Sequence, residues 1–276
     1  MYQPMDLSII ITNYKNPDLL KLCINSILNN VKNIEYEIIV ADSATEEVTE
    51  MMMREEFPTV KFFSFTENVG FKKLVNTGIE NSSGDYFLIL NGDILVKKNS
   101  VEKMLEYAKK DNTLGMIGPR LLNFNGTPQD SCFRFYKPIT IMYRRTVLGK
   151  LPFARKHLEW FLMKDYNRKE PMDVDWLMGS AMLIPRKIFE KVGPMDERFF
   201  MYMEDVDWCR RFWENGYRVI YYPLVEMLHY HGKGSGKNGF FYSIFFNKLT
   251  WVHISSAIKY FLKYRGKQNP RISISN

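Results

Sequence analysis

The chain has 276 residues and a net charge of +7, and 46% of its residues are hydrophobic and 25% charged, as in a soluble globular protein. Its three cysteines, Cys23, Cys132 and Cys209, are widely spaced and form no CxxC pair, which argues against a disulfide framework or a zinc site and favours a reducing cytoplasm. The N-terminus lacks the basic start and long apolar core of a signal peptide. No uncharged apolar run reaches the roughly 18 residues of a membrane-spanning helix.

The first 115 residues alternate between strand-like and helix-like segments at short spacing. Asn16 is expected to cap the first helix, with Pro17 at its first position, and Thr45 is expected to open the second. The expected strands are 7–15, 36–44, 60–70 and 85–96, and the expected helices are 16–30, 45–57, 71–84 and 100–111. This order predicts an α/β fold with a mostly parallel central sheet flanked by helices.

After residue 115 the pattern becomes less regular, with a hairpin turn expected at Asn125-Gly126. A helix is expected around 153–164, a strand over 174–185 with a kink at Gly179, helices over 186–193 and 204–216, and a strand over 217–223. We therefore expect one domain over 1–231, made of a first half (1–115) and a second half (116–231). Residues 232–276 would form a C-terminal extension.

Polar residues follow the expected strands of the first half, and ligands bind at this edge of parallel sheets. Asp93, in the turn-prone NGD sequence, has the carboxylate that Mg²⁺ or Mn²⁺ on a diphosphate would need, although an ordinary turn would look the same. Asp42 would accept a hydrogen bond from a ribose or base, or would cap a helix. The first strand is not followed by GxGxxG, and the chain has no P-loop motif.

Three carboxylates occur in the aromatic-rich stretch FFMYMEDVDWCRRFWENGYR, residues 199–218. Helical spacing places Asp205 on the same face as Trp208, Cys209 and Phe212, which predicts that Asp205 points inward. The alternative is that Glu204, Asp205 and Asp207 are all helix-start residues that pair with Arg210 and Arg211.

A second cluster of polar residues occurs in LHYHGKGSG, residues 228–236. His229 and His231 alternate on an expected strand, so both would project to one face. One imidazole aimed at a metal would complement Asp93, and Lys233 and Ser235 could hold a phosphate.

The positive charge is concentrated in two segments that are also rich in aromatic residues. Residues 133–169 contain 10 Lys and Arg against 2 Asp and Glu, and residues 232–276 contain 8 against none. A basic, aromatic segment that does not span a bilayer predicts binding to an anionic membrane surface or a polyanionic partner. A solvated basic tail is the alternative.

Several segments resemble, in the same order, the family 2 glycosyltransferases with their GT-A nucleotide-sugar-binding fold. They are SIIITNYKNPDLLKLCINSIL, EIIVADSATEE, ENVGFKKLVNTGI and LILNGDI, the last with Asn91 in place of the first Asp of the family's metal-binding DxD. The most specific match runs from VDWLMGSAMLIP to YRVIYYP, over 174–223. The sequence of this segment is most similar to that of bacterial rhamnosyltransferase-type members of the family.

The resemblance implies a nucleotide-sugar half over 1–115 and an acceptor half over 116–231. It also implies that Asp205 is the catalytic base and that Asp93 binds metal, with His229 or His231 as a further ligand. Lys72 and Lys73 replace small residues of the family and either contact a phosphate or are simply exposed. Expected nucleotide-sugar contacts are Thr12, Asn13, Tyr14, Asp42, Asn68, Gly70, Lys73, Asn91 and Gly92. The expected sugar and acceptor pocket consists of Trp176, Gly179, Ser180 and Glu204.

The activity implied is an inverting, Mg²⁺- or Mn²⁺-dependent transfer of a sugar, such as rhamnose, from a dTDP- or UDP-sugar to a hydroxyl of a glycan or lipid-linked glycan. The enzyme would act at the inner face of the cell membrane. No nucleic acid partner is expected, and oligomerisation through the C-terminal segment stays open. A non-catalytic nucleotide-sugar-binding or scaffold subunit is the alternative, because Asn91 departs from the motif. A nucleotidyltransferase is disfavoured because TNYKNPD is not a Gly-rich basic loop.

Overall fold

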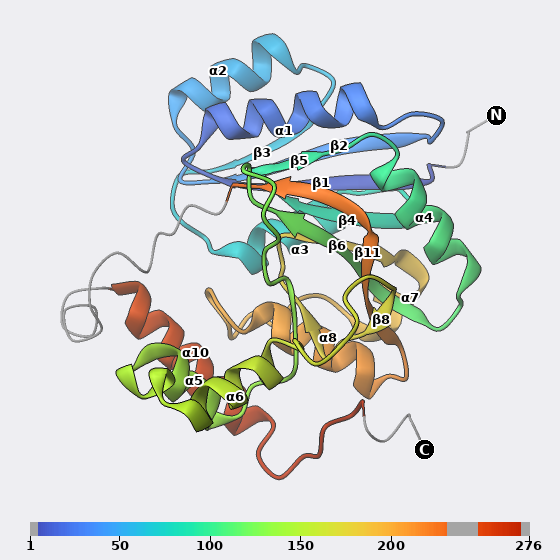
Figure 1. Ribbon diagram of the computed structural model, residues 1–276. Helices are drawn as coiled ribbons and strands as arrows, with labels where there is room; N and C mark the ends of the chain where they lie inside the picture. The colour runs from blue at the N-terminus through green and yellow to red at the C-terminus, as the bar shows by residue number, and fades with distance from the viewer. Residues whose placement is uncertain (1–4, 231–247, 272–276) are drawn as a thin grey trace.

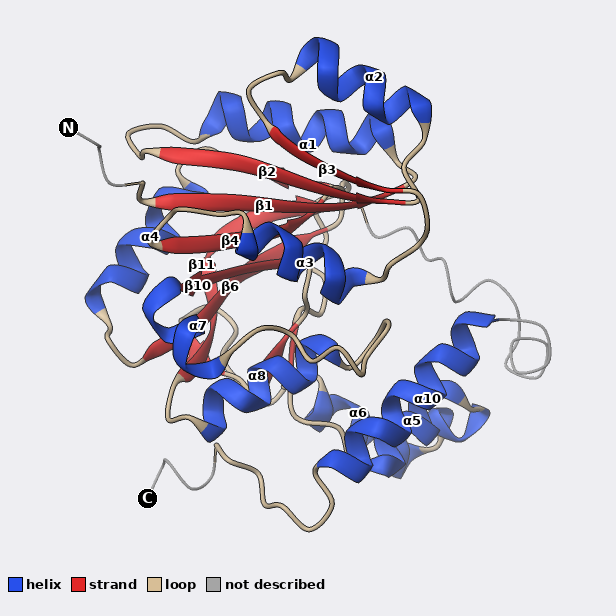
Figure 2. Cartoon of the chain, turned by 180° about the vertical axis from the view of Figure 1, so that it is seen from behind, coloured by secondary structure: helices blue, strands red, loops and turns tan. Residues whose placement is uncertain are grey.

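The computed structural model describes residues 5–230 and 248–271. A large central sheet has helices on both faces (Figures 1 and 2). Its strand order is β3-β2-β1-β4-β10-β6-β11-β5, and β8 pairs with β11. These strands are β1 (Leu7–Tyr14), β2 (Tyr36–Ser43), β3 (Lys61–Phe65), β4 (Tyr86–Asn91), β5 (Ile94–Val96), β6 (Leu114–Leu122), β8 (Met172–Asp173), β10 (Ala181–Pro185) and β11 (Arg218–His229). A separate ribbon pairs β7 (Cys132–Phe133) with β9 (Trp176–Leu177).

The direction of the strands confirms the mostly parallel sheet. β1 is parallel to β2 and β4, β2 is parallel to β3, and β6 is parallel to β11. β10 lies between β4 and β6 and is antiparallel to both, so β4 and β6 run the same way. The predicted α/β fold, a mostly parallel central sheet flanked by helices, is therefore confirmed.

Helices cover both faces because the strand residues alternate between two apolar clusters. Ile9 and Ile11 of β1 pack with α1, α2 and α4, whereas Ile10 packs with α3, α7 and α8. The helices are α1 (Pro17–Asn30), α2 (Glu47–Glu56), α3 (Phe71–Glu80), α4 (Ser100–Lys110), α5 (Pro138–Arg145), the 3₁₀ helix η1 (Val147–Lys150), α6 (Pro152–Phe161), α7 (Arg186–Val192), α8 (Glu204–Glu214) and α10 (Lys248–Lys263).

Helix boundaries follow local signals in most places. The Asn16 side chain accepts a hydrogen bond from the Leu19 amide, which confirms the predicted cap of α1. The prediction that Thr45 opens the second helix is wrong. Glu46 occupies the N-cap of α2, and the Thr45 hydroxyl instead donates to the Asp42 carbonyl at 3.0 Å.

The expected strand over 85–96 is two strands. Only Gly92 and Asp93 separate β4 from β5, and β5 pairs antiparallel with the end of β11, so that Ile94 lies opposite His229. β11 is also longer than the expected 217–223 because it continues past Pro223 to His229. These pairings bring the NGD segment and the end of β11 together.

The described part of the C-terminal segment packs onto the second half of the chain. Ala257, Tyr260 and Tyr264 of α10 and its C-terminal turn belong to the same apolar cluster as α8, and the Ser256 hydroxyl donates to the Met201 carbonyl at 2.8 Å. Among the described helices, none has the length and apolarity needed to cross a bilayer. The three cysteines are buried and unpaired, as expected.

Candidate active site

A pocket of about 250 Å³ opens where β1, β2 and β4 end. Nearly all the residues predicted from the strand ends line it. They are Thr12, Asn13, Tyr14, Asn68, Gly70, Asn91, Gly92 and Asp93. We call this cavity the donor pocket. Lys73 does not line it, because it is exposed on the outer side of α3.

Two glycines of the donor pocket are required by close packing. A Cβ on Gly92 would lie 2.8 Å from the Asn13 Oδ1, and a Cβ on Gly70 would lie 2.2 Å from the Phe200 carbonyl oxygen. Gly70 also has a φ of 77°, which disfavours any side chain. Both positions keep the strand-end backbone open to a ligand.

Asp42 lies behind the donor pocket rather than in its wall. Its side chain is fully buried, and its Oδ1 accepts a hydrogen bond of 2.8 Å from the Asn13 amide. Burial raises the pKa of Asp42 above its ordinary value, and the hydrogen bonds from Thr45 and Asn13 oppose that rise. In this conformation Asp42 acts on the pocket by orienting Asn13.

Asp93 and His229 face each other at the edge of the donor pocket. Gln129 donates its Nε2–H to the His229 carbonyl at 2.9 Å, so its Oε1 is the atom 2.7 Å from His229 Nδ1. Nδ1 must therefore donate, and in the neutral ring the lone pair is on Nε2, which lies 3.4 Å from Asp93 Oδ1. That buried Oδ1 has no hydrogen-bond partner among the described residues.

Two acceptors directed at each other suit a cation between them, and the second hydrogen bond on the imidazole is the usual support of a metal-binding histidine. A divalent ion bound to a diphosphate needs few protein ligands, because the phosphates supply oxygens. Asp93 and His229 therefore fit the expected Mg²⁺ or Mn²⁺, although no group of three or more His, Cys, Asp or Glu within residues 5–230 and 248–271 is arranged to hold a metal ion. His231, Lys233 and Ser235 lie outside the described residues.

A second cavity of about 430 Å³ contains the start of α8. Glu204, Asp205 and Trp176 line it, and we call it the acceptor pocket. Trp176 stacks on Phe133 with ring centroids 4.3 Å apart, and its indole N–H donates to the Arg134 carbonyl. A flat aromatic wall of this kind suits the apolar face of a sugar.

Gly179 lies where the two cavities meet. A Cβ at this position would be 3.0 Å from the ring of Phe71, which lines the donor pocket, and 3.6 Å from the Cβ of Asp205. The neighbouring residue Ser180 is buried, and its carbonyl accepts from the Asn91 amide at 2.9 Å. Gly179 and Ser180 thus form the partition between the pockets, and Asp205 lies directly beside it.

Two backbone amides hold the Asp205 carboxylate. Gly179 N–H donates to Oδ2 at 3.2 Å, and Val206 N–H donates to Oδ1 at 2.9 Å. Burial raises the pKa of Asp205 to about 6, and these amides limit the rise. A carboxylate with this pKa is ionised at neutral pH and is still a stronger base than an ordinary aspartate.

Glu204 lies deeper than Asp205. Its side chain is 6% exposed, and burial followed by repulsion from Asp205 raises the pKa of Glu204 to about 8. The two carboxyls titrate as a coupled pair, and the deeper burial of Glu204 favours the proton on Glu204 and the charge on Asp205. Tyr202 and Met203, just before them, have φ values of 69° and 68°, a strained turn that directs the helix start into the pocket.

Comparison with known proteins shows to which family this chain belongs. The model of the family "Glycosyl transferase family 2" matches residues 8–193, about two thirds of the chain. The chain belongs to glycosyl transferase family 2. The match ends before α8, so the position of Asp205 rests on the geometry described above.

This glycosyltransferase is similar to named rhamnosyltransferases. It is 27% identical over 234 residues to the N-acetylglucosaminyl-diphospho-decaprenol L-rhamnosyltransferase of Mycobacterium tuberculosis, which covers 79% of this chain and 74% of that protein. It is 23% identical over 271 residues to the rhamnosyltransferase WbbL of Escherichia coli K12, covering 93% of each. Its fold is similar to that of GalNAc-T7 solved with UDP, GalNAc and Mn²⁺, with a TM-score of 0.62, 16% identity, and coverage of 82% of this chain and 44% of that one.

Asp207, the third carboxylate of α8 in this glycosyltransferase, lines neither pocket. It is fully buried and contacts Arg211 at 3.0 Å, Lys263 at 2.5 Å and the Tyr264 hydroxyl at 2.8 Å. Arg210 pairs with Glu214 instead. The alternative in which all three carboxylates pair with Arg210 and Arg211 therefore holds only for Asp207.

The acceptor pocket also contains residues that the sequence did not single out. Tyr136, Arg144 and Arg145 come from α5 and the segment before it, Tyr202 from the turn before α8, and His253 from α10. The excess of positive charge over 133–169 was the only sequence signal for the arginines. Nothing local marked His253, since α10 meets α5 only through tertiary packing.

Proposed function

We propose that this glycosyltransferase carries out an inverting, metal-dependent transfer from a nucleoside diphosphate sugar to an acceptor hydroxyl. The observation that supports this most directly is the position of the Asp205 carboxyl group beside Gly179, at the partition between the two pockets. A donor sugar leaving the donor pocket and an acceptor hydroxyl in the acceptor pocket would meet at that carboxylate.

In the proposed step, Asp205 takes the proton of the acceptor hydroxyl. The acceptor oxygen attacks the anomeric carbon on the face opposite the diphosphate, and the bond to the diphosphate breaks with its electron pair leaving on the phosphate oxygen. Asp93 and His229 would hold Mg²⁺ or Mn²⁺, which neutralises negative charge on the diphosphate. Trp176 would orient the acceptor sugar by stacking, and Gly179 keeps the partition thin enough for contact.

The similarity to rhamnosyltransferases supports rhamnose as the sugar, and a decaprenol-diphosphate acceptor in one relative supports a lipid-linked glycan as the acceptor. The donor would then be a dTDP- or UDP-sugar. The rival is a non-catalytic nucleotide-sugar-binding subunit, which would retain the donor pocket and lack turnover.

Binding of the donor is tested by thermal shift against a panel of UDP-, dTDP- and GDP-sugars with and without Mn²⁺. We expect one donor class to stabilise the protein only when Mn²⁺ is present, and Asp93→Asn to weaken that binding about tenfold or more, because it removes a charged ligand. Asp130→Asn is the matched control, since Asp130 lies outside the donor pocket and pairs with Arg168. No response to any sugar of the panel would reject the transfer proposal, whereas donor binding without turnover would favour the rival.

We further propose that the protein binds an anionic membrane through the surface formed by η1 and the start of α6. Val147 and Phe153 are 69% and 61% exposed there, among Lys150, Arg155 and Lys156. Exposed apolar side chains with surrounding cations suit an interface of acidic lipids.

Co-sedimentation with vesicles tests this surface. Wild type is expected to bind phosphatidylglycerol vesicles and not phosphatidylcholine vesicles. The double variant Val147→Ser with Phe153→Ser should lower that binding about tenfold. Full burial of each apolar side chain contributes about 1.5–3 kcal/mol, and only part of this free energy is gained at a membrane interface. Leu22→Ser with Val48→Ser, at exposed positions of α1 and α2 on the opposite side of the molecule (Figure 1), is the control. Equal binding by the two double variants would contradict the proposed surface.

A further inference from the structure

Two adjacent arginines at the end of α5 line the acceptor pocket without a carboxylate partner. Arg144 is exposed and Arg145 is half-buried, and no Asp or Glu oxygen lies within 4.0 Å of either guanidinium in the described part of the chain. Arg144 donates to the Tyr136 hydroxyl and Arg145 donates to His253 Nδ1. Neutral partners leave both positive charges uncompensated.

The electrostatics of their neighbours show that this charge acts within the pocket. Burial, followed by the charge of Arg144, lowers the pKa of Arg145 below its ordinary value. Holding the charged guanidinium of Arg145 beside that of Arg144 is therefore electrostatically unfavourable. Burial, Arg145 and Arg144 together lower the pKa of His253 to about 4. A location in the last turn of a helix explains why arginines are tolerated at these positions, but it does not explain why both line a cavity.

The arginines and the carboxylate of the proposed base lie in one cavity. Tyr136, which accepts from Arg144, is partly buried; burial raises the pKa of its hydroxyl, and the charge of Asp205 adds to that rise. Arg144 also lines an adjoining cavity of about 620 Å³, whose wall includes Leu158, Phe161 and Lys150. The arginines therefore stand between the reacting end of the acceptor pocket and a partly apolar space that leads toward η1.

We propose that Arg144 and Arg145 form an anion subsite that holds a phosphate or diphosphate group of the acceptor, while a hydroxyl of the same molecule lies at Asp205. The inference rests on the proposed function for the role of Asp205, but the subsite itself needs no turnover. Two guanidinium forks offer more donors than one carboxylate can accept, and they match the several oxygens of a phosphate group. The group comes either from a lipid-linked sugar, whose chain would follow the adjoining cavity, or from a free sugar phosphate.

Binding of inorganic pyrophosphate by calorimetry tests the subsite in buffer with EDTA, so that metal-dependent binding in the donor pocket is suppressed. We expect saturable binding to wild type, about tenfold weaker binding for Arg144→Gln or Arg145→Gln, and about a hundredfold weaker binding for the double variant, since each charge-assisted contact contributes about a factor of ten. The conservative double change Arg144→Lys with Arg145→Lys should recover part of the affinity. Thermal unfolding of each variant shows whether it is folded.

Two controls locate the bound anion. Arg265→Gln removes an exposed arginine that lines neither pocket, and Asp93→Asn alters the donor pocket; both should bind pyrophosphate as wild type does. In NMR, pyrophosphate should raise the pKa of His253, because a nearby anion favours the protonated ring. Equal affinity of the folded double variant and Arg265→Gln, or an unchanged His253 pKa, would overturn the subsite. A changed affinity in Asp93→Asn alone would assign the anion to the donor pocket and would also overturn it.

The source of the phosphate group is decided by comparing pyrophosphate with dodecyl phosphate below its micellar concentration. Tighter binding of dodecyl phosphate, dependent on Arg144 and Arg145, supports a lipid-linked acceptor. Equal or weaker binding supports the same subsite with a soluble sugar phosphate. Because these titrations contain no donor, they can succeed when the transfer proposal fails, and the reverse also holds.

Discussion

Asp205→Asn is expected to lower kcat by about a thousandfold and to leave the affinity for the nucleotide sugar unchanged. General base catalysis contributes roughly 10²–10⁴ in rate. The asparagine amide cannot take the proton of the acceptor hydroxyl, although it is nearly isosteric with the carboxylate that Gly179 and Val206 hold. Turnover under saturating donor and acceptor, and calorimetric titration of the donor, measure the two quantities separately.

The pH profile of kcat/KM provides a second readout of the same assignment. As the proposed base, Asp205 would act only when deprotonated, and burial raises its pKa to about 6. Activity should therefore fall as the pH drops through about 6, whereas an ordinary aspartate would keep it down to about 4. The control is Glu47→Gln, which removes an exposed carboxylate from the first turn of α2 and should change neither the turnover nor the affinity for the donor. Retained turnover in Asp205→Asn would exclude Asp205 as the base, and a parallel loss of donor affinity would indicate structural damage instead.

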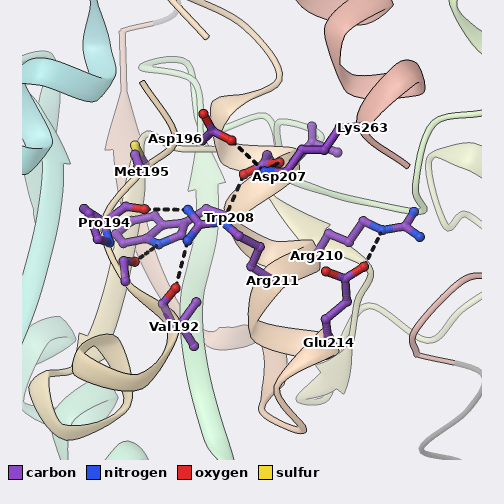
Figure 3. Close-up of polar contacts among 12 residues, drawn as sticks. Val192, Pro194, Met195, Asp196, Asp207, Trp208, Arg210, Arg211, Glu214 and Lys263 are labelled. Carbon is purple, nitrogen blue, oxygen red and sulfur yellow. Dashed lines mark hydrogen bonds and ion pairs between the residues drawn. The ribbon is translucent and has the colours of Figure 1, made fainter. Parts of the chain in front are cut away.

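Asp207→Asn is expected to lower the free energy of unfolding by about 3 kcal/mol. Asp207 is fully buried and is the shared partner of Arg211 and Lys263 (Figure 3) and of the Tyr264 hydroxyl. Removing one partner of a buried ionic group leaves the remaining charges uncompensated, which typically costs about 3–5 kcal/mol. Because Lys263 belongs to α10, the loss should weaken the attachment of that helix to α8. Urea unfolding measures the change.

The matched control for this variant is Glu106→Gln. Glu106 pairs with Lys110 at 2.6 Å on the exposed surface of α4, and such exposed pairs contribute little to stability, so we expect almost no change. A loss of equal size in the two variants would contradict the structural role of Asp207. If folded Asp207→Asn lost turnover as completely as Asp205→Asn, the division of tasks between the two carboxylates would be wrong.

The strand ends of the first half were predictable because their signals are local. Apolar runs predict buried strands, and polar residues at their carboxyl ends must meet at one edge of a parallel sheet. Thr12, Asn13, Asn68 and Asn91 accordingly line one pocket. Lys73 was expected to join them, but helical rotation turns it outward on α3 while Leu74 faces the pocket. A position next to a motif does not establish the direction of a side chain.

The sequence by itself determined the α/β fold, the sheet edge at which the donor pocket opens, and the helix face on which Asp205 lies. Only the tertiary structure decided which distant groups the carboxylates meet. The pairing of β5 with β11 brings His229 to Asp93, and the packing of α10 brings Lys263 to Asp207 and His253 to Arg145. The physical reason is the distance along the chain over which each effect acts. Spacing along the chain controls the direction of a side chain within one element. Contacts between distant elements control which partner that side chain meets and, through burial, its charge.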